Sequence, residues 1–84
     1  MPKPNLHVTI MSPERTLYEG EAKSVSSVNN VGRFDILAHH ANFISLIREH
    51  ITVHTSRGQT QKFDILSAVI HVKANRVRAF VVFA

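Results

Sequence analysis

Hydrophobic and polar residues alternate along much of the chain with the two-residue period of a half-buried β-strand. The clearest case is residues 5–11, where Leu6, Val8 and Ile10 fall on one face. Turn signals rich in Pro, Asn, Gly or Ser divide the rest into short segments at 15–19, 22–28, 33–37, 46–55, 60–66, 68–73 and 77–83. This pattern predicts an all-β fold, a small antiparallel β-sandwich or flattened barrel of about 8–10 short strands.

One region is ambiguous between strand and helix. Phe43, Ile44, Ile47 and Ile51 also satisfy a helical spacing. Because β-branched side chains dominate residues 51–55, we expect a strand over 46–55, preceded by an irregular stretch or one helical turn at 38–45. The apolar face of the predicted strands gives the expected core: Leu6, Val8, Ile10, Val25, Phe34, Ile36, Ile51, Val53, Phe63, Ile65, Ile70 and Val72.

Length and composition exclude several classes of protein. With 84 residues, the chain is expected to form a single domain, residues 1–84. It has no cysteine, which excludes disulfide frameworks and thiolate chemistry. No apolar run approaches the ~18–20 residues of a membrane span, and no signal peptide is expected. The formal net charge of +4 suits a phosphate, an anionic membrane surface or an acidic partner, and does not choose among them.

The six histidines raise the question of a metal site. His50 and His54 would share a face of a helix, but on a strand they lie about 13 Å apart, too far for one ion. His39 and His40 are adjacent and point to opposite sides of an extended chain. A composite site with His7 or His71 stays open. No ligand spacing matches an established metal motif, so we predict no metal and no cofactor.

Signatures of catalysis are also missing. The chain has no nucleophile elbow, no zinc-protease motif and, with three glycines, no phosphate-binding glycine loop. Lys73, Arg76 and Arg78 cluster near one predicted hairpin and suggest nucleic-acid binding, but most of the phenylalanines fall at expected core positions rather than on a base-stacking face. We therefore predict neither an enzyme nor a nucleic-acid partner.

The last predicted strand points to another polypeptide. Residues 79–84 (AFVVFA) are apolar on both faces, whereas a strand buried on one side should alternate. One face of this segment is therefore expected to meet something beyond its own core.

Three segments of the chain, in the same order, resemble the N-terminal β-sandwich domain of F-type ATP synthase epsilon subunits. They are residues 12–21 (SPERTLYEGE), 32–41 (GRFDILAHHA) and 63–77 (FDILSAVIHVKANRV). The chain departs from the family pattern at 28–29, 38–39 and 49–50, where Pro-Gly is usual, and at 67–68, where Gly-Gly is usual. Asn and His enter the left-handed region more readily than most residues, so the altered turns are expected to survive at some cost.

The resemblance implies a non-catalytic rotor subunit. Its partners would be a gamma-like central shaft and the subunits of a membrane rotor ring, during ATP synthesis driven by protons or sodium. It would lie at the cytoplasmic face of the inner membrane of a bacterial cell, held there only through the complex. Two C-terminal helices usually follow in the family and carry inhibition and, in some members, an ATP site. The sequence ends at Ala84, before such helices would begin.

The resemblance also assigns candidate contact residues. The ring side is expected to include Gly32, Arg33, His39 and His40, where Arg33 replaces a usually acidic residue and so reverses its charge. The side facing the shaft is expected to include Met11, Ser12, Phe80 and Val82. Two alternatives stay open: a free-standing β-module that binds a carbohydrate or nucleic acid, and a metal-binding regulator based on the histidines.

Overall fold

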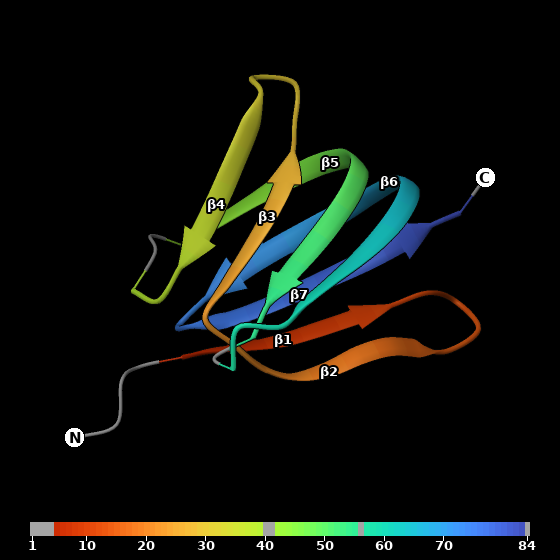
Figure 1. Ribbon diagram of the computed structural model, residues 1–84. Helices are drawn as coiled ribbons and strands as arrows, with labels where there is room; N and C mark the ends of the chain where they lie inside the picture. Colours follow the sequence, from red (N-terminus) through yellow and green to blue (C-terminus); the bar gives the residue numbers. More distant parts are fainter. Residues whose placement is uncertain (1–4, 40–41, 56, 84) are drawn as a thin grey trace.

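The computed structural model of the chain describes residues 5–39, 42–55 and 57–83. These residues form one sheet of seven strands and no helix (Figure 1). The strands are β1 (Leu6–Met11), β2 (Thr16–Ala22), β3 (Ser24–Val28), β4 (Arg33–Leu37), β5 (Phe43–His54), β6 (Thr60–Lys73) and β7 (Arg76–Val82). Their order in the sheet is β2-β1-β7-β6-β5-β3-β4, antiparallel throughout except that β1 runs parallel to β7.

The all-β prediction is confirmed, but the strands are fewer and two are longer than predicted. The segments predicted at 60–66 and 68–73 are one strand of 14 residues, because no residue with a turn conformation separates them. Strand β5 begins at Phe43, three residues before the predicted start, and the residues from Phe43 onward are extended rather than irregular or helical. The parallel pairing of β1 with β7 joins the two ends of the chain and was not predicted.

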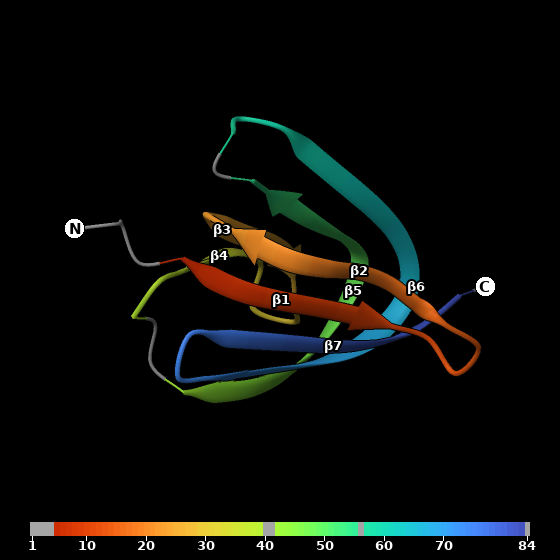
Figure 2. The same cartoon turned by 90° about the horizontal axis from the view of Figure 1, so that it is seen from below.

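The two long strands turn one sheet into two layers. Strands β5 and β6 curve strongly, as Figure 2 shows. The second half of β6 pairs with β7, and the second half of β5 pairs with β3. One layer therefore contains β2, β1, β7, the second half of β6 and the first half of β5. The other layer contains β4, β3, the second half of β5 and the first half of β6.

The core lies between these layers. Ten of the twelve predicted core residues are buried; Phe34 and Phe63 are only partly buried and pack against the core from its margin. Each of these two rings meets an aromatic ring of the opposite layer edge-on: Phe63 meets Tyr18 at 6.4 Å and Phe34 meets Phe43 at 6.0 Å. The two pairs close the two open sides of the sandwich. Buried residues outside the prediction are Ala22, Val28, Ile47, Ala68, Val77, Ala79, Val81 and Ser27.

A bulge in β5 marks the bend between the layers. The pairing register of β5 shifts against both β3 and β6 next to Glu49, whose φ is 72°. His39, with φ 65°, is the other left-handed residue at a position where the resembled family has Pro-Gly. The expectation that His39 tolerates this conformation is confirmed, whereas at 49–50 the left-handed residue is the glutamate and not the histidine.

No helix among the described residues meets the length and hydropathy that crossing a membrane requires.

Candidate partner-binding surfaces

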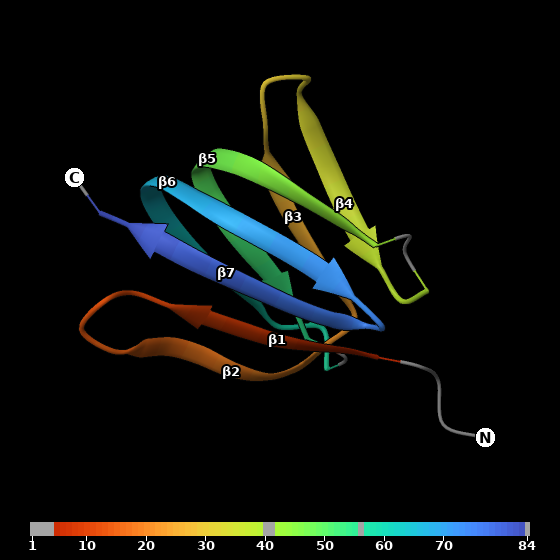
Figure 3. The ribbon, with the colours of Figure 1, turned by 180° about the vertical axis from the view of Figure 1, so that it is seen from behind.

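An apolar row crosses the outer face of four neighbouring strands. Leu46 on β5 pairs with Val69 on β6, Val69 pairs with Phe80 on β7, and Phe80 pairs with Met11 on β1. Figure 3 shows these strands side by side, seen from behind the view of Figure 1. We call these four residues the outer row. Leu46 is 72% exposed and Phe80 is 50% exposed, so the row lies on the surface although its strands also line the core.

The outer row follows directly from alternation along β7. Ala79 and Val81 face inward and are buried, whereas Phe80 and Val82 point outward and are half-exposed. From the sequence, one face of residues 79–84 is expected to meet something beyond its own core. The structure shows that the outward face at Phe80 and Val82 is exposed, and the contact itself stays a prediction. Monomeric proteins seldom leave contiguous apolar surface uncovered, so a row of this kind is typical of a contact with another polypeptide.

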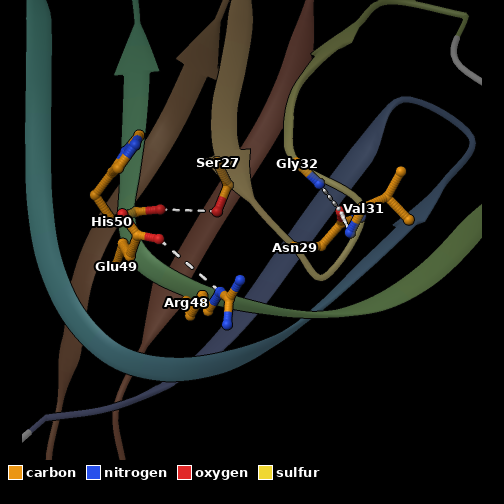
Figure 4. Close-up of polar contacts among 7 residues, drawn as sticks. All are labelled: Ser27, Asn29, Val31, Gly32, Arg48, Glu49 and His50. Carbon is orange, nitrogen blue, oxygen red and sulfur yellow. Dashed lines mark hydrogen bonds and ion pairs between the residues drawn. The ribbon is translucent and has the colours of Figure 1, made fainter.

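A second candidate surface lies at the turn between β3 and β4. We call residues 29–33 the lip. The side-chain oxygen of Asn29 accepts hydrogen bonds from the backbone N–H groups of Val31 at 2.9 Å and Gly32 at 3.2 Å (Figure 4). Gly32 has φ 141°, a conformation that favours glycine. These bonds hold the turn in one conformation and present Val31, which is 90% exposed, at its tip.

The bulge in β5 contacts β3 just before that strand enters the lip. The buried hydroxyl of Ser27 donates a hydrogen bond of 2.7 Å to the carbonyl of His50, which the bulge displaces from regular pairing with β3. Next to it, Arg48 lies 3.9 Å from Glu49, an exposed ion pair (Figure 4). A shallow pocket of about 210 Å³ lies between the lip and β5, and it is lined by Asn29, Asn30, Leu46, Ile47 and Arg48.

The structure gathers the four residues predicted to face the shaft. Met11 and Phe80 are direct cross-strand partners, Val82 shares the outward face of Phe80, and Ser12 follows Met11 at the end of β1. The hydroxyl of Ser12 bonds to the backbone of Arg15, which fixes the turn into β2.

The residues predicted for the ring side are more dispersed. Gly32 and Arg33 lie in the lip, whereas His39 lies beyond the opposite end of β4, a strand about 13 Å long. The backbone N–H of His39 bonds to the side chain of Asn75 at 2.6 Å. His40 lies outside the described residues. A flat surface that touched Gly32, Arg33 and His39 would have to run along the whole of β4.

The histidines do not converge in the part of the chain that the structure describes. No group of three or more His, Asp or Glu side chains there is placed to hold a metal ion. His54 contacts the hydroxyl of Ser26 at 3.1 Å, and His50 contacts the hydroxyl of Thr52 at 3.0 Å. His7 lies 3.6 Å from Glu19 on the neighbouring strand. These described contacts are local to the sheet surface.

Sequence reasoning missed Leu46, Val69 and Val31. Leu46 and Val69 join the outer row only through the register between neighbouring strands, which a single sequence does not indicate. Val31 could have been found from the sequence, because it is an apolar residue at the tip of a predicted polar turn.

Comparison with known proteins identifies the family. The profile of the ATP synthase delta/epsilon chain β-sandwich domain matches residues 5–82. An ATP synthase epsilon chain from Caulobacter vibrioides is 37% identical over 60 residues, which cover 71% of this chain and 70% of that one. Another, from Clostridium novyi, is 32% identical over 69 residues, which cover 81% of this chain and 53% of that one.

Solved structures agree on the fold. A chain in the mitochondrial ATP synthase of Euglena gracilis superposes with a TM-score of 0.86 at 16% identity, covering 93% of this chain and 51% of the other. A chain in the Tetrahymena thermophila central stalk and c-ring structure gives a TM-score of 0.77 at 13% identity, covering 98% of this chain and 66% of the other. The chain thus spans about half the length of the Clostridium and Euglena proteins. The family match supports the resemblance found in the sequence and not its two alternatives: the chain belongs to the ATP synthase delta/epsilon β-sandwich family.

Proposed function

We propose that this chain is a non-catalytic rotor subunit of an F-type ATP synthase, coupling a gamma-like central shaft to the membrane rotor ring. It would lie at the cytoplasmic face of a bacterial inner membrane and reach the membrane only through the complex. The main support for the proposal is that a domain of this family exposes the apolar outer row, a surface typical of contact with another polypeptide. A subunit that transmits torque needs a stiff body and outward surfaces for its neighbours, rather than a catalytic cleft.

The stiffness has a physical basis in the described residues. The core is continuous between two layers that share the long strands β5 and β6. Aromatic pairs at both open sides tie the layers to each other. Because packed interiors resist compression, a load applied to one surface of such a body is transmitted to the other.

We assign the outer row, with Ser12 and Val82, to the shaft. Burying exposed Leu46, Phe80 and Val82 against a partner would remove apolar surface from water, which stabilises the contact by roughly 25 cal/mol per Å² before ordering costs are deducted. We assign the lip to the ring, with His39 and His40 as further ring contacts. In this assignment Arg33 requires a complementary, more acidic loop on the ring, since like charges in contact disfavour a complex.

The test is assembly of the purified chain with the shaft and ring of the same ATP synthase. Arg33→Glu should weaken assembly with the ring, and Arg57→Glu, which changes an exposed arginine in a different turn, should not. Assembly that is unchanged or strengthened by Arg33→Glu would remove Arg33 and the lip from the ring contact. Failure of the unsubstituted chain to associate with either subunit would refute the rotor role itself.

A further inference from the structure

The end of the β6–β7 hairpin carries a dense group of basic side chains on its outer face. His71 and Lys73 on β6 are direct cross-strand partners of Arg78 and Arg76 on β7, respectively. Together with Ala74 these residues line a pocket of about 280 Å³. The pocket is separate from the lip and lies on the turn side of the outer row, because Arg78 precedes Phe80 on the same face of β7.

Among the described residues, no carboxylate forms a direct ion pair with the lysine or the arginines of this pocket. The ion pairs that the described residues form join His7 to Glu19, Arg48 to Glu49 and Lys62 to Asp64, and none includes Lys73, Arg76 or Arg78. Like charges placed directly opposite each other on neighbouring strands destabilise a sheet. The pairing of Lys73 with Arg76 therefore carries a repulsion that a bound anion would relieve.

The hairpin that presents these side chains is held in place from several directions. Ala74 and Asn75 both have positive φ, 52° and 62°, as in the two-residue turns whose twist matches an antiparallel pair. The N–H of Ala74 donates to the side chain of Asn42 at 3.3 Å. Asn75 accepts from the N–H of His39 through its side chain and from the N–H of His7 through its carbonyl, at 2.9 Å for the latter. A backbone that is already held in one conformation loses less conformational entropy when a ligand binds.

The geometry points to this pocket as a binding site for a diphosphate-class anion, in the form of either a soluble diphosphate or the headgroups of anionic phospholipids. Arg76 and Arg78 project from the same face about 7 Å apart, which suits two neighbouring phosphoryl groups better than one small ion. Two guanidinium groups and one ammonium offer more N–H donors than a single carboxylate can accept. The three formal positive charges of Lys73, Arg76 and Arg78 also balance the negative charge of a diphosphate.

The first experiment is titration of the isotope-labelled chain with inorganic pyrophosphate at constant ionic strength, followed by NMR. Saturable shifts confined to residues 71–78 are expected. The double substitution Arg76→Gln with Arg78→Gln should weaken binding at least tenfold, and Lys62→Gln, whose lysine pairs with Asp64 elsewhere on the sheet, should leave it unchanged. The spectrum of each variant reports directly whether it is folded. Shifts spread evenly over all basic residues, or equal affinity in the double variant, would overturn the proposal.

Two further arms identify the source of the anion. Sedimentation with vesicles that contain phosphatidylglycerol, but no response to pyrophosphate, would assign the site to lipid headgroups, provided the double variant loses vesicle binding. Absence of both responses would refute an anion site. Tighter binding of polyglutamate than of pyrophosphate, with shifts at the same residues, would instead make the hairpin a docking surface for an acidic protein and contradict the proposal.

Discussion

The hydroxyl of Ser27 lies 2.7 Å from the carbonyl oxygen of His50, and Ser27 is 1% exposed. Strand β5 leaves its regular pairing with β3 between Ile51 and Arg48, so His50 has no register partner on β3. A side-chain hydrogen bond thus joins the two strands at the point where their regular pairing is interrupted. This contact links the core to the lip, because Ser27 precedes the turn by two residues.

We expect Ser27→Ala to destabilise the fold by about 1–3 kcal/mol, the usual cost of leaving a buried polar group without its partner. Urea unfolding followed by circular dichroism measures this difference. Ser24→Ala on the same strand is the matched control, since the Ser24 hydroxyl forms no hydrogen bond with any residue that the structure describes. It should change the free energy of unfolding by less than about 0.5 kcal/mol. Equal effects of the two substitutions would show that the bond to His50 has no structural role.

Glu49 carries backbone strain at the bulge. A residue with a Cβ atom at φ 72° costs about 1–2 kcal/mol relative to glycine. Glu49→Gly should therefore unfold at higher denaturant than Glu49→Ala, by about 1 kcal/mol in free energy. Both substitutions remove the exposed pair with Arg48, so the comparison isolates the backbone effect. A more stable alanine variant would mean that the bend does not need the left-handed conformation.

Neighbouring residues on β6 should respond differently to truncation. Ile70 is fully buried between the layers, whereas Val69 belongs to the outer row. Ile70→Ala should cost about 2–5 kcal/mol because it opens a cavity in the core. Val69→Ala should cost under about 1 kcal/mol in the isolated chain. Thermal unfolding of the two variants distinguishes them; similar losses would place Val69 in the core and remove it from the outer row.

Much of the fold was predictable because alternation along a strand directly encodes which side chains point inward. Phe34 and Phe63 were the exceptions: they lie at the margins, where each meets a ring from the other layer, and sequence does not say which core positions are marginal. The merging of 60–66 with 68–73 was missed because a strand that bends between two layers changes which face is covered.

The candidate surfaces were predictable in part for a related reason. Phe80 and Val82 stood out because residues 79–84 are apolar at every position, a property that one segment of the sequence shows by itself. Leu46 and Val69 join them only through pairing between strands, which depends on register. The separation of Gly32 from His39 by the length of β4 could have been inferred from the sequence, because this strand was predicted at 33–37, the bounds that the structure gives.

The absence of cysteine from the chain makes the assignment of the outer row directly measurable. A single cysteine at Phe80, carrying a photoreactive maleimide, can be placed in the assembled ATP synthase and activated by light. Phe80→Cys should cross-link predominantly to the shaft subunit, and Lys62→Cys, on the half of β6 that belongs to the other layer, should not. Equal labelling from both positions, or adducts from Phe80→Cys that contain no ATP synthase subunit, would contradict the account.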